Sequence, residues 1–223
     1  MNPGLEPLRR RMDAELPVKW LFTGDSVTHG ALHTWGHRDY TELFSERIRW
    51  ELGRYRDLIL NTGVSGRTIA DLAADLDWSV FQFRPDVVLL MFGINDSRGG
   101  TDGVDEFRRQ LGNVIERIRD FNAATTILLQ TPNPVLPEAF PLRAALPSYA
   151  EAVRRTATAM QVPLIDHWDY WQRAAEADSL RRIAWMNDEL HPNAYGHLAI
   201  AAHLLRELEL WDAQSQSGRL FLP

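Results

Sequence analysis

The sequence predicts an α/β protein in which a five-stranded parallel sheet, wound as in flavodoxin, lies between two layers of helices. Five short apolar segments alternate with longer amphipathic segments, and this alternation is typical of a parallel sheet covered on both faces. The segment 86–93, "DVVLLMFG", is apolar almost throughout, as expected of a strand buried on both faces. With 223 residues, 45% of them hydrophobic, the chain can form one large domain with a full core.

The predicted elements follow one another in a regular order. We expect strands at 18–24, 57–61, 86–93, 125–131 and 162–166, and helices at 40–52, 68–76, about 104–120, about 144–160, 168–184 and about 194–208. Right-handed crossovers favour the strand order 2-1-3-4-5, with ligands bound beyond the carboxyl ends of the strands. We expect an N-terminal extension at 1–17, the domain at 18–211 and a C-terminal tail at 212–223.

Composition argues against several classes of function. The formal net charge is −6 and the basic residues are scattered, which argues against nucleic acid as a partner. There is no cysteine, so neither disulfides nor thiolate metal sites can form. The basic cluster at 9–11 is followed by no apolar run, and no segment has the length of a transmembrane helix. We therefore expect a cytoplasmic protein that binds no membrane.

Polar residues and glycines follow the first three predicted strands, which are neighbours in this strand order. Ser26 follows the first strand in "TGDS", Gly66 the second in "NTGVSG", and Asn95 the third in "FGIND". The backbone N–H groups of Ser26 and Gly66 and the side-chain amide of Asn95 can supply three donors to an oxyanion, which acyl transfer requires. Each of these residues, taken singly, fits an ordinary turn equally well.

A serine becomes a nucleophile only when a base takes its proton, and the base is commonly a histidine oriented by a carboxylate. His191 in "NDELHPN" is the candidate base, because Asp188 precedes it by three residues. The Asp188 carboxylate can accept from the imidazole Nδ1–H, which leaves Nε2 for Ser26. Three other histidines of the C-terminal part are interpreted as packing or surface residues: His167, His197 and His203.

Together, "GDS", "NTGVSG", "GIND" and "DELHPN" resemble the four sequence blocks of the GDSL/SGNH hydrolases, in the family order, between about residue 19 and residue 208. The resemblance implies the SGNH hydrolase fold and no metal or organic cofactor. It also implies a role for each matching residue: Ser26 as nucleophile, His191 as base, Asp188 to orient His191, and Gly66 and Asn95 as oxyanion-hole donors. The first block has valine where the commonest form has leucine, and the GxSxG elbow of α/β-hydrolases is absent.

Within that family the chain is similar to esterases that remove acetyl groups from xylan-type saccharides, a likeness carried by "GINDSRGG" and "LHPNAYGHLAIAAHLL". We expect serine-dependent deacetylation of an oligosaccharide or small-molecule ester through an acyl-enzyme. Aromatic and polar side chains suit a sugar ring, and four residues are candidates for substrate binding: Asp25, His33, Trp35 and Trp185. Two alternatives stay open: a short-chain acyl esterase, lysophospholipase or thioesterase with the same machinery, and a non-catalytic sugar-binding module.

Three further segments bear on the site or on assembly. His29, His33 and His37 are four residues apart, but glycines interrupt the segment, so we expect no metal there and either a cleft-lining loop or a surface loop. The proline-rich segment 131–147 is long enough to shape or cover the cleft. The apolar end of "SGRLFLP" favours docking of the tail on this chain or on a second copy, and hence a homo-oligomer.

Overall fold

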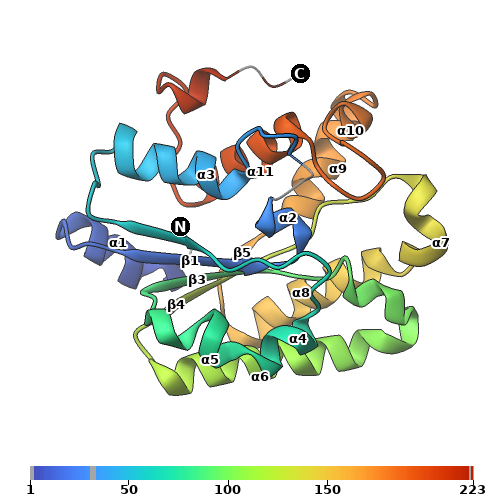
Figure 1. The fold of residues 1–223 in the computed structure, drawn as a ribbon, viewed down its shortest axis with the longest axis horizontal. Coiled ribbons are helices and arrows are strands. Elements are labelled where there is room, and N and C mark those ends of the chain that lie inside the picture. The colour runs from blue at the N-terminus through green and yellow to red at the C-terminus, as the bar shows by residue number, and fades with distance from the viewer. Residues whose placement is uncertain (1–2, 31–33, 221, 223) are drawn as a thin grey trace.

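The computed structural model describes residues 3–30, 34–220 and 222 (Figure 1). It has five strands, β1 Lys19–Gly24, β2 Leu58–Asn61, β3 Val87–Met91, β4 Thr126–Gln130 and β5 Leu164–Ile165. The α-helices are α1 Glu6–Asp13, α2 Ser26–His29, α3 Tyr40–Ser45, α4 Ile69–Ala74, α5 Leu76–Ser79, α6 Val104–Phe121, α7 Phe140–Arg143, α8 Leu146–Met160, α9 His167–Ala177, α10 Arg181–Ala184 and α11 Ala194–Glu207. One π-helix, Glu46–Glu51, continues α3, and single-turn 3₁₀ segments occupy Pro3–Leu5, Phe81–Phe83, Asp96–Gly99, Thr101–Gly103, Pro137–Ala139 and Ser217–Arg219.

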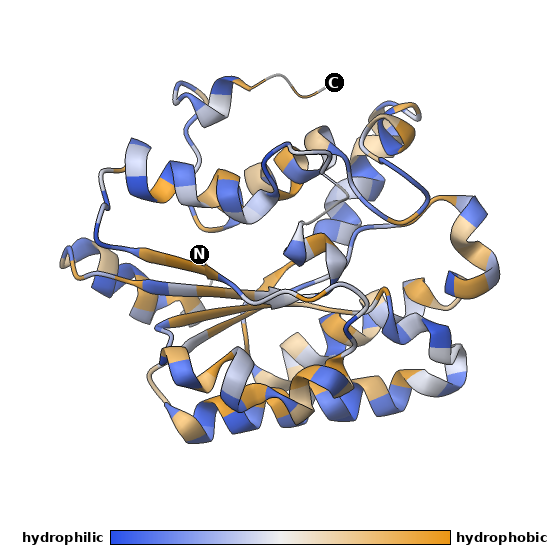
Figure 2. Ribbon diagram, viewed as in Figure 1, coloured by the Kyte–Doolittle hydropathy of each residue, from blue (hydrophilic) through white to orange (hydrophobic). Residues whose placement is uncertain are grey.

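The structure confirms the predicted fold. The five strands form one parallel sheet in the order β2-β1-β3-β4-β5. Helices α3, α9 and α11 cover one face of this sheet, and α4, α5, α6 and α8 cover the other (Figure 1). Apolar residues line the strands and the inner sides of the helices, while hydrophilic residues gather on the outer sides (Figure 2). Residues of β1, β3 and β4 are buried throughout or nearly so, as strands covered on both faces require.

The strand register brings the candidate segments to one edge of the sheet. Gly24, the last residue of β1, pairs with Met91, the last residue of β3. β2 ends earlier, with Asn61 opposite Phe22, but its extension keeps to the edge of β1 because Val64 N–H donates to Gly24 O at 3.0 Å. The segments that follow β1, β2 and β3 therefore leave the sheet beside one another.

The structure differs from the expected elements in detail. The predicted helix at 40–52 changes to a π-helix after Ser45, the helix at 68–76 breaks at Asp75, and the helical region at 168–184 is interrupted after Ala177. Within residues 1–17, α1 packs Leu8 into the core. Among the described residues, no helix is long and apolar enough to cross a membrane.

The C-terminal segment packs against the same chain. Ser217 is buried and bonds to Glu51 through both its backbone N–H, at 2.6 Å, and its hydroxyl, at 2.8 Å. Leu222 packs against the core, and Leu220 is partly exposed.

Candidate active site

Ser26 is the first residue of α2 and follows the end of β1 by two residues. Asp25 caps this helix, because its carboxylate accepts the Val27 N–H at 3.0 Å while its backbone remains extended. Gly30 ends the helix in a left-handed conformation. The short strand-to-helix turn places Ser26 at the first helical position, where its own N–H has no intrahelical partner. Ser26 as a whole is only 6% exposed.

The Ser26 hydroxyl lies against His191, although the two residues are 165 positions apart. Ser26 Oγ is 2.9 Å from His191 Nε2. On the other side of the ring, His191 Nδ1 is 2.8 Å from Asp188 Oδ2 and 3.0 Å from Oδ1. The carboxylate favours the tautomer in which Nδ1 carries the proton, and in that tautomer Nε2 can accept from the serine. The structure thus brings together the serine, histidine and aspartate that the sequence singled out.

The Asp188 carboxylate is held ionised by its own loop. Partial burial raises its pKa, but this is outweighed by hydrogen bonds from the His191 and Leu190 N–H groups and from the His191 ring, which bring the pKa below its usual value. The two backbone donors lie 2.7 Å and 2.8 Å from Asp188 Oδ1. An ionised carboxylate at this position can stabilise an imidazolium at His191.

A tight turn presents Asp188 and His191 to the serine. Asn187 N–H donates to His191 O at 2.8 Å, and an antiparallel bridge joins Met186 to Pro192. Asn193 then caps α11 through its side-chain oxygen and donates from its amide to two carbonyls of the preceding segment. These bonds fix both ends of the turn to the scaffold.

Three candidate oxyanion donors converge on the same edge of the sheet. Gly66 has φ +85°, a left-handed conformation that favours glycine, and a side chain there would point into open space. Asn95 Nδ2 donates to Arg67 O at 3.2 Å, which holds the amide next to Gly66 and leaves its second N–H for a ligand. Within the described part of the chain, the N–H groups of Ser26 and Gly66 donate to no protein acceptor.

Two carboxylates adjoin the candidate donors in sequence, Asp25 buried and Asp96 partly buried. Asp25 is 2% exposed, and burial, reinforced by the nearby Asp96, raises its pKa to about 7. Burial also raises the pKa of Asp96 to about 6, although its oxygens accept the Ile69 and Gly93 N–H groups at 2.8 Å and 3.1 Å. Asp25 was expected to bind substrate. The structure corrects this, because the side chain points into the protein and caps α2 instead.

The aromatic candidates separate into one exposed and one buried ring. Trp35 is 78% exposed, and its indole N–H donates to Asn187 Oδ1 at 2.6 Å, so it lies at the rim beside Asp188. Trp185 was expected in the cleft, but it is 1% exposed and packs edge-on against Trp171, with ring centroids 5.1 Å apart. Trp185 is therefore a core residue.

The histidines that follow Ser26 in the sequence have separate outcomes. His29 Nδ1 lies 3.0 Å from Ser65 Oγ and accepts the Ser65 N–H at 3.3 Å, which ties α2 to the segment after β2. His33 lies outside the described residues. Among residues 3–30, 34–220 and 222, no group of three or more His, Asp or Glu side chains could hold a metal ion.

Several residues that hold the site together escaped the sequence analysis. Asn193, directly before the last predicted helix, has the signature of an N-cap and could have been recognised. His29 and Asn133 have no local signal, because each acts across segments distant in the sequence. Asn133 Nδ2 donates to Leu190 O at 3.3 Å and so joins the proline-rich segment to the turn that carries His191.

Known proteins resemble the chain over most of its length. Residues 22–199 match the model of the GDSL-like Lipase/Acylhydrolase family. The chain is 28% identical to an acetylxylan esterase of Geobacillus stearothermophilus over 212 residues, which cover 85% of this chain and 93% of the esterase.

Solved structures share the fold. An α/β hydrolase enzyme from the metagenome of Lake Arreo, Spain, is 26% identical, with a TM-score of 0.73 over 87% of this chain and 96% of that one. The crystal structure of the acetylxylan esterase from Geobacillus stearothermophilus has the same TM-score of 0.73 at 24% identity, over 89% of this chain and 97% of the esterase.

Proposed function

Because the chain belongs to the GDSL-like lipase/acylhydrolase family and is an ester hydrolase of that family, we propose that it works through a covalent acyl-serine on Ser26 and removes acetyl groups from an O-acetylated, xylan-type saccharide. The observation that carries the mechanism is the continuous contact from Ser26 Oγ through the His191 ring to Asp188. The preference for an acetylated saccharide draws on the acetylxylan esterase relative and on the exposed indole at the rim of the site.

In the first half-reaction, Ser26 Oγ attacks the ester carbonyl carbon while its proton moves to His191 Nε2. The carbonyl oxygen becomes negative and accepts hydrogen bonds from the Ser26 and Gly66 N–H groups and the Asn95 amide. Collapse of this tetrahedral intermediate breaks the bond to the alcohol oxygen, which leaves with the proton from His191 Nε2. The product is an acetyl-serine and a free sugar hydroxyl.

In the second half-reaction, a water molecule replaces the alcohol. His191 Nε2 takes one of its protons as the water oxygen attacks the acetyl-serine, and the same three donors hold the oxyanion. The bond to Ser26 Oγ then breaks, the serine recovers its proton from His191, and acetate leaves. Asp188 stays ionised throughout and compensates the positive charge of the ring in both halves.

Trp35 supports a cyclic alcohol. An indole that is mostly exposed yet anchored by its N–H offers a flat apolar face, and a sugar ring has apolar C–H faces that can pack on it. Asn187, which anchors Trp35, is followed directly by Asp188, and this link between the ring and the turn that carries His191 supports a contact of Trp35 with the sugar.

The test compares acetate release from acetylated xylooligosaccharides with hydrolysis of p-nitrophenyl acetate by wild type, Ser26→Ala and Ser148→Ala. Ser148 is exposed on α8, so its variant controls for loss of a hydroxyl. We expect Ser26→Ala to lose about 10⁴-fold or more in kcat on both substrates and Ser148→Ala to match wild type. A fluorophosphonate should label wild type at Ser26, identified by peptide mass.

Each other outcome selects an alternative. Turnover of p-nitrophenyl esters alone, undiminished at long acyl chains, would favour an acyl esterase, lysophospholipase or thioesterase. Saccharide binding by a wild type that hydrolyses no ester and takes no label would favour a sugar-binding module. Undiminished turnover by Ser26→Ala would refute the role of Ser26.

A further inference from the structure

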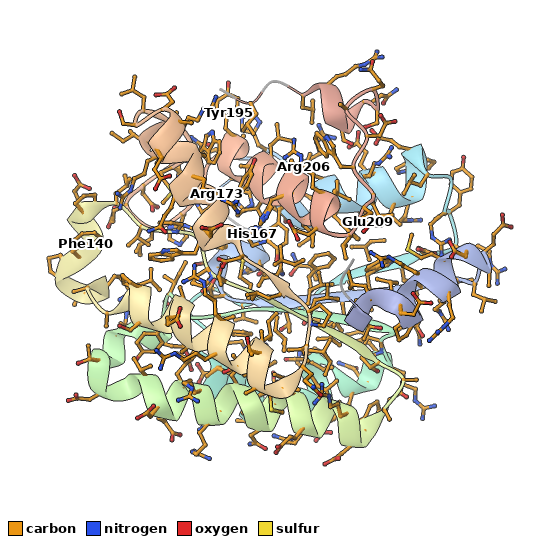
Figure 3. All side chains as sticks on the ribbon, turned by 180° about the vertical axis from the view of Figure 1, so that it is seen from behind. Phe140, His167, Arg173, Tyr195, Arg206 and Glu209 are labelled. Atoms are coloured by element: carbon orange, nitrogen blue, oxygen red, sulfur yellow. The ribbon has the colours of Figure 1, made fainter. Side chains whose placement is uncertain are left out.

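A file of neighbouring polar side chains runs from α2, the helix that begins at Ser26, over one face of the sheet to the outer side of α11. The proposed mechanism uses none of these side chains. The members come from five different elements, and all except the last are buried: Thr28, Tyr40, Gln130, His167, His203 and Glu207. Figure 3 shows α9, which begins at His167, beside α11, which carries Arg206 next to Glu207. Buried polar groups are costly unless each has its partner, so every bond along this file has to be accounted for.

Successive members of the file lie next to one another, and three of the pairs are within hydrogen-bonding distance. Thr28 Oγ1 is 3.0 Å from the Tyr40 hydroxyl, which in turn lies beside the Gln130 amide. Gln130 Oε1 is 3.0 Å from His167 Nε2, and His167 Nδ1 is 3.0 Å from His203 Nδ1. At the outer end, His203 Nε2 is 3.5 Å from a carboxylate oxygen of Glu207.

Both histidines are uncharged near neutral pH. Burial and the neighbouring His203 lower the pKa of His167 well below its usual value. Burial lowers the pKa of His203 to about 4; Arg173 and Arg206 act in the same direction and Asp166 opposes them. Each ring therefore has one N–H donor and one acceptor nitrogen.

When both rings are neutral and Gln130 Oε1 faces His167, two groups lack a suitable hydrogen-bond partner. His167 must then donate from Nε2, so its Nδ1 has no proton and accepts from His203 Nδ1–H. The other nitrogen of His203, Nε2, then has no proton and faces the Glu207 carboxylate. Two acceptors would face each other there. At the inner end, Gln130 Nε2 is buried and has no acceptor among the described residues.

We propose that the Gln130 amide is turned by half a rotation, so that Nε2 donates to His167 Nε2 and the whole file donates in one direction, from Thr28 to Glu207. Thr28 O–H then donates to Tyr40, Tyr40 O–H to Gln130 Oε1, His167 Nδ1–H to His203, and His203 Nε2–H to Glu207. In this arrangement the buried Gln130 Nε2 gains an acceptor in His167 Nε2, and His203 Nε2–H faces the Glu207 carboxylate. The Nε2 and Oε1 ends of an amide are told apart by such bonds.

The inner end of the file, at Thr28 and Tyr40, gives it a role at the active site. Thr28 lies two residues after Ser26 in the four-residue helix α2, and its backbone carbonyl accepts from Asn61 Nδ2 at 2.6 Å. The hydroxyl bond to Tyr40 is a further anchor of this short helix, in addition to the contact of His29 with Ser65. Because α2 carries both the Ser26 hydroxyl and the Ser26 N–H, Thr28 and Tyr40 act as positioning residues for the nucleophile and for one oxyanion donor. This second part of the proposal depends on the proposed role of Ser26, whereas the direction of the file does not.

Imidazole tautomers test the direction. Long-range ¹H–¹⁵N correlation spectra of the labelled wild-type protein at neutral pH, assigned through the ring carbons, report which nitrogen of each ring carries a proton. We expect a proton on Nδ1 of His167 and on Nε2 of His203. A proton on Nε2 of His167, alone or in exchange with Nδ1, would overturn the proposed direction.

Kinetics test the positioning role. Thr28→Val removes the hydroxyl at constant shape and Tyr40→Phe removes its acceptor, whereas Thr28→Ser keeps the hydroxyl. On p-nitrophenyl acetate we expect the first two variants to lose about fivefold in kcat with KM unchanged, the equivalent of one hydrogen bond, and Thr28→Ser to restore it.

Tyr170→Phe is the matched control, because its ring stacks on His203 while its hydroxyl lies outside the file. An equal loss in this variant, or a rise in KM alone in the others, would refute the positioning role. A wild type without esterase activity would refute the proposed function and leave the tautomer result standing.

Discussion

Replacing Asp25 by asparagine removes a buried charge beneath the nucleophile and changes little else. The asparagine side chain would keep the oxygen that accepts the Val27 N–H, so the cap of α2 survives. What the change removes is the carboxyl group whose pKa burial raises from 3.8 to about 7. The prediction concerns how the free energy of unfolding varies with pH.

The sign follows from the two pKa values. Below pH 3.8 Asp25 is protonated in both the folded and the unfolded protein. As pH rises toward 7, the unfolded chain releases its proton while the folded protein retains it, so the wild type loses stability across this window. A difference of about three pKa units corresponds to at most about 4 kcal/mol. Asp25→Asn has no carboxyl group at this position and therefore does not lose this stability as pH rises.

Urea unfolding of wild type and Asp25→Asn at about pH 4.5 and about pH 7.5 measures the effect, because the same acidic and basic groups titrate in both proteins except at this position. We expect the free energy of unfolding of Asp25→Asn to exceed that of wild type at about pH 7.5. This excess should be several times the difference between the two proteins at about pH 4.5. Asp77→Asn, at an exposed position, serves as the control and should run parallel to wild type. Parallel profiles for Asp25→Asn and wild type would refute the reasoning.

Four further substitutions probe other parts of the molecule. Asn95→Ala should lower kcat for p-nitrophenyl acetate by about 10²- to 10³-fold with little effect on KM, because one oxyanion donor is lost; an unchanged kcat would remove Asn95 from the oxyanion hole. Gly196→Ala would place a Cβ 2.2 Å from the Trp185 carbonyl oxygen and should cost about 2 kcal/mol in urea unfolding. Gly112→Ala, on a helix with no atom within 4 Å of the new Cβ, should instead stabilise by about 1 kcal/mol. Trp35→Ala should raise KM for acetylated xylooligosaccharides and leave hydrolysis of p-nitrophenyl acetate unchanged; equal effects on both substrates would contradict a sugar contact.

The topology could be predicted because its signal is local and repeated. Each strand is a short apolar run followed by a helical segment, and chirality leaves few ways to wind such units. Once the order was set, the carboxyl ends of neighbouring strands had to meet, and this brought Ser26, Gly66 and Asn95 to one edge. The spacing of Asp188 and His191 was likewise informative, because a three-residue turn suffices to join a carboxylate to the imidazole.

The wrong expectations both concern the direction of a single side chain, and they have different physical causes. Trp185 is close to Asp188 in sequence, but the bridge between Met186 and Pro192 turns the chain, so its ring faces Trp171 in the core. Asp25 precedes the nucleophile, yet the extended backbone that caps α2 directs its carboxyl group inward. The direction of Trp185 depends on contacts with a segment distant in sequence, whereas that of Asp25 follows from a local cap that an aspartate before a helix could have indicated.

The separation of Ser26 from His191 has a consequence for synthesis. Ser26 precedes His191 by 165 residues, so a growing chain contains the serine long before it contains the turn that carries the proposed base. On the proposed mechanism, a chain that ends before Asp188 and His191 has nothing to take the proton of the Ser26 hydroxyl. Fragments that lack this turn should therefore fail to react with a fluorophosphonate at Ser26.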